Sequence, residues 1–398
     1  MLASSKRIII ILNRLVVGGQ TLDTLPLLHC LCKEFDILVL HGEKEKDEKD
    51  ASPLLKKFSL NGEYIPSLKR NINPVNDIRA FLKVYAVIKS FKPQIVHTHG
   101  SKSGLIGRLA AYRAKVPVII HTFHGHLFHS YYNSFFSSVL KRSERQLSRI
   151  TSTAIAISEW QKKELCEFYK IAPAEKVKVI HLGITVQQST EEKDQLRKSF
   201  REKYNVGDEV IAIGIVGRIV PIKNLSMFVE VAAELLETTK MPLRFFIIGD
   251  GYLKKEVEEQ CDSKKLSWTN NGTGIGTPVI FTSWIDEIIP AILGLDIVVL
   301  TSNNEGTPMS IIEAQSCGKP VVATNVGGVR DTLIDKQTGF LVPPGDVQAM
   351  VKKLQYLVEN AELRTQMGLQ ATEFASSQFS KQAEIENFKK LYSSAIQG

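Results

Sequence analysis

The sequence predicts an α/β protein that contains two doubly wound parallel sheets. Its 398 residues exceed the size of one ordinary hydrophobic core, which favours two domains. Short apolar runs rich in Val and Ile alternate with longer amphipathic stretches along the whole chain. The short runs are almost continuously apolar, as in parallel strands that helices cover on both faces.

The predicted strands form two series. The first series lies at residues 6–12, 36–40, 94–99, 117–123, 154–158 and 176–183. The second lies at 210–218, 243–251, 278–284, 296–302 and 319–325. Residues 73–91 and 224–239 have helical apolar spacing, with Asn, Asp or Pro near their starts. Because ligands bind beyond the carboxyl ends of parallel strands, we expect the two sheets to face a central cleft and functional residues to follow strands.

The series of strands is interrupted once. Residues 185–205 are polar and charged and show no strand pattern. We therefore place an N-terminal Rossmann-like domain at 1–190 and a C-terminal Rossmann-like domain at 191–375, followed by a terminal segment at 376–398. The charged run 43–50 and the Gly-rich and Asn-rich stretch 267–278 are predicted to be surface loops.

The net charge of +8 is unevenly distributed. Residues 1–190 contain 28 Lys and Arg against 15 Asp and Glu, whereas residues 191–398 contain 22 against 27. A basic half favours an anionic partner, such as a membrane surface, a phosphorylated substrate or nucleic acid. The alternative is that these charges are scattered over a solvated surface.

The start of the chain predicts a buried first strand and not a secretory signal. Asn13 and Arg14 interrupt the apolar run, and no small-residue cleavage site follows. The sequence contains no run of about 18 apolar residues, so we expect no membrane-spanning helix. The five cysteines are odd in number and lack C-x-x-C spacing, which is typical of reduced thiols in a cytoplasm.

The stretch SNNEGTPMSIIEAQSCGKPVV, residues 302–322, joins a predicted strand to a predicted helix. The free amides and the dipole of a helix N-terminus favour a phosphate group. Glu305 precedes this helix and Glu313 lies within it, so two carboxylates could bind the hydroxyls of a ribose and of a transferred sugar. The alternative is that Glu305 caps the helix and Glu313 is an exposed helical residue.

Other candidate residues follow other predicted strands. Gly217, Arg218 and Lys223 follow the strand at 210–218, and two cations at this spacing can neutralise a diphosphate. Alone, they could be surface charges. Gly18 and Gly19 follow the first strand and would let the backbone approach a ligand closely, unless they only form a tight turn.

Six of the nine histidines lie between residues 97 and 129. One interpretation is a metal site within HTFHGHLFH, residues 121–129, although no Asp/Glu pair or Cys nearby completes a ligand shell. The other is a single functional histidine at a strand end, His124. The aromatic residues that follow, as far as residue 136, suit a lipid interface or a core.

Together these features resemble glycosyltransferase family 4, the retaining and metal-independent transferases with the GT-B fold. The resemblance extends over most of the chain, in seven motifs that occur in the expected order. These are VGG (17–19), HTFHG (121–125), GIVGRIVPIKN (214–224), IIGDG (247–251), EGTPMSIIEA (305–314), KPVVATNVGG (319–328) and TGFLVPPGD (338–346). Two departures are Asp331, where the family often has Glu, and the long stretch 267–278.

The resemblance implies a role for each candidate residue. It implies catalytic roles for His124, Arg218, Lys223 and Glu305, and donor-binding roles for Gly18, Gly19, Gly217, Gly306, Thr307, Met309 and Glu313. Arg218 and Lys223 would bind the donor diphosphate, Glu305 the donor sugar and Glu313 the ribose. The leaving phosphate would deprotonate the acceptor on the same face of the sugar. The resemblance also implies no metal or other cofactor, and a terminal helix that returns to the first domain.

We therefore expect a cytoplasmic hexosyltransferase that builds a surface polysaccharide such as a capsule or exopolysaccharide. It would move a hexose or N-acetylhexosamine from a nucleotide-diphosphate sugar, with UDP preferred, to a glycan or polyprenyl-diphosphate-linked acceptor. Its basic N-terminal half would face the inner surface of the membrane. The alternatives are a nucleotide-sugar epimerase or hydrolase of the same fold, and a basic nucleic-acid-binding protein, for which no recognition module is evident.

Overall fold

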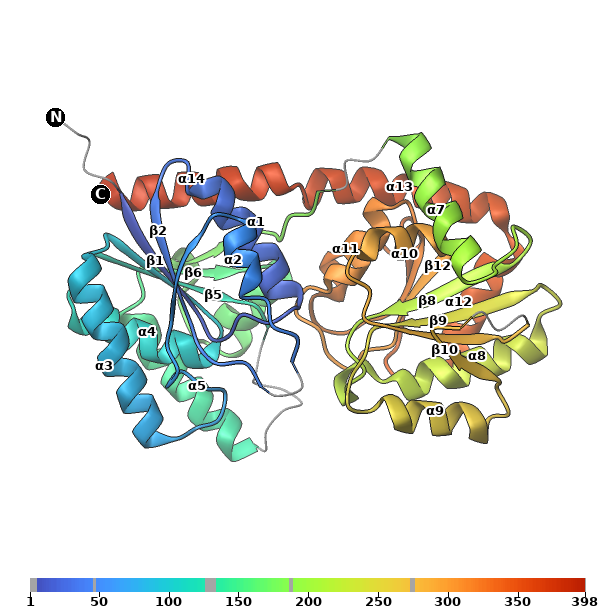
Figure 1. The fold of residues 1–398 in the computed structure, drawn as a ribbon, viewed down its shortest axis with the longest axis horizontal. Coiled ribbons are helices and arrows are strands. Elements are labelled where there is room, and N and C mark those ends of the chain that lie inside the picture. The colour runs from blue at the N-terminus through green and yellow to red at the C-terminus, as the bar shows by residue number, and fades with distance from the viewer. Residues whose placement is uncertain (1–5, 46–47, 126–133, 186–188, 273–275, 398) are drawn as a thin grey trace. The chain divides into compact units, whose positions relative to one another are not determined.

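The computed structural model describes residues 6–45, 48–125, 134–185, 189–272 and 276–397 (Figure 1). The chain divides into two compact units. Unit 1 comprises residues 1–183 and 380–398, and unit 2 comprises residues 184–379. None of the helices in these described ranges is both long and apolar enough to cross a bilayer.

Unit 1 is built on a seven-stranded parallel sheet with the order β3-β2-β1-β4-β5-β6-β7. Its strands are β1 Arg7–Leu12, β2 Asp36–His41, β3 Asn61–Tyr64, β4 Ile95–His99, β5 Val118–Phe123, β6 Thr153–Ala156 and β7 Val177–Val179. Its longer helices are α1 Gly19–Leu31, α3 Pro74–Phe91, α4 Ser101–Arg113, α5 Ser134–Arg149 and α14 Lys381–Gln397. The short ones are α2 Pro53–Lys57, α6 Glu159–Lys163, the π-helical turn η1 Glu164–Phe168 and the 3₁₀ turn η2 Ala174–Lys176.

The packing of strand β1 explains its run of four isoleucines, Ile8 to Ile11. Ile8 and Ile10 pack in a core that includes residues of α1 and α14, whereas Ile9 and Ile11 pack in a separate core with α3 and α4. Successive side chains of a strand point to opposite faces, so a central strand covered on both faces needs an apolar residue at every position.

Unit 2 repeats this plan with the strand order β10-β11-β9-β8-β12-β13-β14, also parallel throughout. Its strands are β8 Ile211–Val216, β9 Leu243–Ile248, β10 Trp268–Asn270, β11 Val279–Ser283, β12 Ile297–Leu300, β13 Val321–Thr324 and β14 Gly339–Val342. Its α-helices are α7 Thr190–Lys203, α8 Leu225–Thr238, α9 Lys254–Ser263, α10 Ile288–Gly294, α11 Met309–Ser316, α12 Val347–Glu359 and α13 Ala361–Gln378. Two 3₁₀ turns, η3 Pro221–Lys223 and η4 Gly327–Asp331, lie in loops that follow strands.

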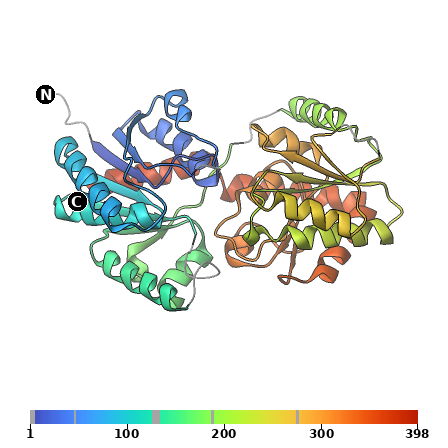
Figure 2. The same cartoon turned by 60° about the horizontal axis from the view of Figure 1, so that its bottom comes forward.

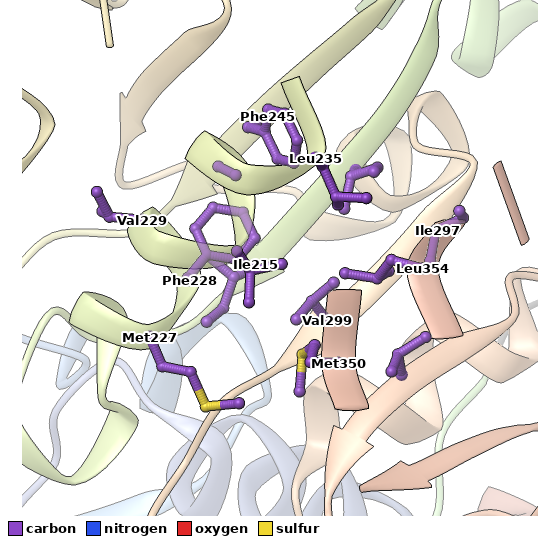
Figure 3. Packing of buried hydrophobic residues seen from close by; sticks show 14 of the residues in the cluster. Ile215, Met227, Phe228, Val229, Leu235, Phe245, Ile297, Val299, Met350 and Leu354 are labelled. Atoms are coloured by element: carbon purple, nitrogen blue, oxygen red, sulfur yellow. The ribbon is translucent and has the colours of Figure 1, made fainter. Parts of the chain in front are cut away.

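Helices α8 and α12 cover one face of the unit 2 sheet (Figure 3). Phe228 and Leu235 of α8, and Leu354 of α12, pack with Ile215 of β8 and Val299 of β12 in one apolar core. This packing fixes the strands whose loops carry most of the candidate residues of unit 2.

The predicted α/β class with two doubly wound parallel sheets is confirmed. The prediction of a loop at 267–278 is wrong in part, because Trp268–Asn270 forms edge strand β10; residues 273–275 of this stretch lie outside the described residues. The predicted strand at 176–183 is shorter, Val177–Val179. The charged stretch 185–205 contains helix α7, whose capping box joins Ser189 and Glu192, and α7 belongs to unit 2.

Helix α14 completes unit 1 through a buried ion cluster. The Lys381 Nζ donates to Asp23 Oδ1 of α1 at 2.6 Å and to Glu384 Oε2 at 2.6 Å. The Gly183 N–H also donates to Glu384 Oε2, at 3.1 Å. Burial raises the pKa of Glu384 to about 8 and also raises the pKa of Asp23. The ammonium group of Lys381 therefore compensates carboxyl groups that burial disfavours as anions.

Replacing Lys381 by Met should strongly destabilise unit 1, because it leaves Asp23 and Glu384 buried without their cation. We expect the free energy of unfolding in urea to fall by about 3–5 kcal/mol. The matched control is Lys390→Met on the exposed side of the same helix, with an expected change within about 0.5 kcal/mol. Equal, small losses for both variants would show that the ion cluster does not hold α14 in place.

Candidate active site

The candidate residues of unit 2 gather where the order of strands reverses. On one side of β8 the sheet holds β9, β11 and β10, which the chain forms after β8, whereas on the far side of β12 it holds β13 and β14, which the chain forms after β12. Strands β8 and β12 lie side by side, with Ile213 paired with Ile297. The loops that follow them therefore lie where the crossovers diverge at the carboxyl edge of the sheet, the position at which open parallel sheets bind ligands.

The loop after β8 begins at Gly217. This residue has φ 151°, which favours glycine. A Cβ at the neighbouring Gly249, which follows β9, would lie 2.0 Å from the Gly217 carbonyl oxygen, so the two loops can pack only without that atom. The Arg218 side chain is exposed and, within the described ranges, has no salt-bridge partner. It is therefore free to bind an anion.

Lys223 and Glu305 form an ion pair although 82 residues separate them in the sequence. The Lys223 Nζ donates to Glu305 Oε1 at 2.6 Å, and the Ser302 hydroxyl donates to the same oxygen, also at 2.6 Å. The side chains of Lys223 and Glu305 are 20% and 12% exposed. Both therefore remain within reach of a ligand. The structure thus brings together Lys223 and Glu305, two of the candidate residues, and adds Ser302, which the sequence prediction missed.

The loop from Glu305 to Pro308 leads into helix α11. A Cβ at Gly327, in the loop after β13, would lie 2.0 Å from the Glu305 carbonyl oxygen, and the Gly328 N–H donates to that oxygen at 3.2 Å. The Thr307 hydroxyl is buried and has no hydrogen-bond partner in the described part of the protein. Gly306 and Met309 are half-buried on either side of it. An unsatisfied buried hydroxyl beside an ion pair is a ready contact for a polar ligand.

Glu313 lies in α11, one side of which packs in the core of unit 2. Its carboxylate keeps part of its surface accessible, and no other described residue donates a hydrogen bond to it. Burial raises the pKa of Glu313 to about 7. The alternative of an exposed helical glutamate is therefore wrong. The alternative of a Glu305 cap is wrong as well, because α11 begins after Pro308 and has no side-chain cap.

Unit 1 shows the same reversal between β1 and β4. Gly18 and Gly19 follow β1 and begin α1, and Gly19 is exposed. Gly18 has φ 172°, an extended conformation open to any residue, and an added Cβ would meet nothing within 4 Å. A tight turn therefore does not explain this glycine. It leaves open space in front of the backbone at the edge of the sheet.

His124 follows β5 and is hydrogen-bonded to a second histidine. Its Nε2 lies 2.8 Å from Nδ1 of His99, the last residue of β4. Burial lowers the pKa of His124 to about 4, so the ring is neutral at neutral pH and can accept or donate one hydrogen bond. The Nε2 of His99 is buried without a partner among the described residues. His99 was not predicted, although its position at a strand end is a signal in the sequence.

The other histidines of this region that the structure describes serve the core. His97 bonds the Tyr392 hydroxyl of α14 and the Thr122 hydroxyl, each at 2.7 Å, and His121 bonds the Thr98 hydroxyl at 2.8 Å. His126 and His129, with the aromatic residues up to 133, lie outside the described residues. Among the residues that are described, no group of three or more His, Cys, Asp or Glu side chains is arranged to hold a metal ion.

Two family models match the two halves of the chain. The model described as Glycosyltransferase Family 4 matches residues 18–188, and the one described as Glycosyl transferases group 1 matches residues 197–374. Together they account for most of the chain, and each covers the greater part of one unit.

Several curated proteins are similar to the chain along most of their length. The UDP-Gal:alpha-D-GlcNAc-diphosphoundecaprenol alpha-1,3-galactosyltransferase of Escherichia coli is 28% identical over 79% of this chain and 80% of its own. The capsular polysaccharide biosynthesis glycosyltransferase CapM of Staphylococcus aureus is 26% identical over 86% of this chain and 87% of its own.

Solved structures share the fold. Alr3699/HepE of Anabaena, solved in complex with UDP-glucose, has a TM-score of 0.79 and 20% identity, over 98% of this chain and 99% of that one. The sucrose-phosphate synthase of Thermosynechococcus elongatus has a TM-score of 0.81 and 17% identity, over 98% and 99%. The paired family matches and this fold show that the chain is a glycosyltransferase of family 4 with the GT-B fold.

Proposed function

We propose that the protein transfers a hexose or N-acetylhexosamine from a UDP-sugar to a glycan or polyprenyl-diphosphate-linked acceptor during surface polysaccharide synthesis. The observation that carries this proposal is the Lys223–Glu305 ion pair between the loops that follow β8 and β12. The names of two relatives support it, since one acts on a diphosphoundecaprenol-linked sugar and the other serves capsule synthesis. Work at a lipid-linked acceptor would bring the protein to the inner face of the membrane.

The charges of unit 2 suggest how the donor binds. Lys223 and the exposed Arg218 would neutralise the diphosphate, and Glu305, held by Ser302, would accept hydrogen bonds from the transferred sugar. The backbone at Gly217 and at Gly306 would approach the phosphates closely. The Thr307 hydroxyl and the first amides of α11, from Met309 onward, would supply donors to the same oxygens.

The remaining candidates would contact the ribose and the transferred sugar of the donor. Glu313 would accept hydrogen bonds from the ribose hydroxyls, because it is half-buried and its carboxylate has no hydrogen-bond donor among the described residues. Neutral His124, oriented by its bond to His99, would contact the transferred sugar. The open backbone at Gly18 and Gly19 would lie against the donor.

We propose that transfer retains the configuration of the sugar and requires no metal. The Glu305 Oε1 already accepts bonds from Lys223 and Ser302, which makes this carboxylate a poor nucleophile and suits it to binding. The bond from the anomeric carbon to the diphosphate would break, and the acceptor oxygen would bond that carbon on the same face. The acceptor proton would pass to the departing diphosphate, whose charge Arg218 and Lys223 would balance.

Calorimetric titration of UDP, GDP, ADP and CMP, with EDTA present, tests the donor site. We expect micromolar binding of UDP alone. Lys223→Ala should weaken UDP binding roughly tenfold to hundredfold, since it removes a charged donor to the diphosphate. The control, Lys198→Ala, changes a lysine on α7 that is 77% exposed and should leave the affinity unchanged. Tighter binding of GDP or ADP would change the assigned donor, and no binding would refute the proposed site.

The UDP affinity should depend on the protonation of Glu313. The pKa of this carboxyl is raised to about 7, so the free protein holds a neutral acid below that pH. A carboxylate binds ribose hydroxyls better, and the affinity should fall as pH decreases below about 7, by up to roughly tenfold per pH unit. Glu313→Gln should bind more weakly and lose this part of the pH dependence. Identical pH profiles for both proteins would exclude a ribose contact.

Product stereochemistry tests retention. With an α-linked UDP-sugar and an accepted sugar acceptor, proton NMR should show the small anomeric coupling of an α-linked product, at the same initial rate with EDTA or Mg²⁺. A β-linked product would refute a same-face transfer, and a rate restored only by Mg²⁺ would refute metal independence.

A further inference from the structure

Helices α3 and α4, together with Ile72 just before α3, carry a set of exposed apolar side chains on unit 1. These are Ile72, Val75, Ile78, Leu82, Leu105, Leu109 and Tyr112, which we call the α3–α4 face. They make up seven of the 17 exposed large apolar residues in the described ranges. Ile78 and Leu82 are 61% and 57% exposed, so packing within unit 1 does not explain them. Such a concentration marks a contact surface.

The apolar residues of the two helices lie on the same side of unit 1. On α3 they are spaced by three and four residues, and on α4 by four and three, so each set forms one stripe. Both helices bury their opposite sides, through Val84 and Ala110 among others, in the one core that contains Ile9 and Ile11 of β1. The stripes therefore both point away from the sheet. Figures 1 and 2 show α3 and α4 next to each other on this side of unit 1.

The charges beside the α3–α4 face are predominantly basic. Arg79 and Arg113 are exposed and have no salt-bridge partner among the described residues. The one acidic residue within α3 and α4, Asp77, is already paired with Lys102 at 2.6 Å. The face therefore combines apolar side chains with unneutralised arginines, and Tyr112 adds a ring with a polar tip.

The combination of apolar side chains and arginines distinguishes between two partners for this face, a second copy of the chain and a membrane. A second copy of the chain, docked by a two-fold axis, would bring the same arginines near their own copies, which like-charge repulsion opposes. The surface of an anionic bilayer accepts apolar side chains at its boundary and attracts arginines to its headgroups. We propose that the α3–α4 face is the surface through which the protein binds an anionic phospholipid membrane.

This inference rests on the proposed lipid-linked acceptor for its purpose, and it deepens that proposal by naming the surface. Unit 1 would lie on the bilayer through α3 and α4, with the apolar stripes at the headgroup boundary. Binding would then depend on two separable terms: burial of Ile78 and Leu82, and attraction of Arg79 and Arg113.

Co-sedimentation of the full chain with vesicles tests the proposal. Vesicles of phosphatidylcholine alone should bind little protein, and vesicles that also contain phosphatidylglycerol should bind it in a salt-sensitive way. The double change Ile78→Asp and Leu82→Asp should lower the partition coefficient at least tenfold. Arg79→Gln with Arg113→Gln should lower it by about fivefold per arginine.

The matched control is Leu369→Asp on α13, where a leucine that is 70% exposed lies outside the α3–α4 face; this variant should bind like the wild type. Failure of the wild type to bind, or an equal loss in the control, would overturn the proposal. So would a shift from dimer to monomer in the Ile78→Asp/Leu82→Asp protein on sizing chromatography, because the face would then join two copies. Calorimetric UDP affinity should be unchanged in every variant; absent UDP binding in the wild type would instead refute the donor site, whatever the vesicles show.

Discussion

Two neighbouring parallel strands must be joined by a crossover that returns over one face of the sheet. In this protein that constraint applies to both sheets, and the carboxyl ends of all strands in a unit therefore lie at the same edge of its sheet. The loops after β8 and β12 separate because the crossovers leave these strands in opposite directions. The position of these two loops is a product of chain connection, and it brings Lys223 and Glu305 together. Close contacts at Gly249 and at Gly327 pack each of these two loops against a neighbouring loop, the one after β9 and the one after β13.

The electrostatic environments of Glu305 and Glu313 differ. Glu305 is paired with Lys223 and bonded by Ser302, so its charge is already compensated and its position fixed. Glu313 has neither partner, and burial alone raises the pKa of its carboxyl. One glutamate is thus fixed by an ion pair before any ligand arrives, whereas the carboxyl of the other is protonated below about pH 7 in the free protein. The same type of residue, eight positions apart, therefore has two different environments.

Central strands and the edge strand β7 could be predicted from the sequence, whereas the edge strands β3 and β10 could not. Strands β8 and β12 are buried on both faces and read as unbroken apolar runs. The edge strands β3 and β10 have the sequences NGEY and WTN, which resemble loops because an edge position does not require apolar residues on both faces. The positions of the candidate residues after strands were also predictable. The hydrogen bonds between these side chains could not be predicted. The contact of Lys223 with Glu305 and that of His124 with His99 depend on side-chain geometry across loops.

Helix α14 has a consequence for the order of folding during synthesis. Unit 2 is one continuous stretch of chain, but unit 1 needs residues that leave the ribosome after all of unit 2. Until then the N-terminal strands lack Phe388 and Tyr392 of their core, and Asp23 lacks the ammonium group of Lys381. The half of the protein that is translated first therefore reaches its native state last, and it remains exposed to chaperones and proteases while the second half folds.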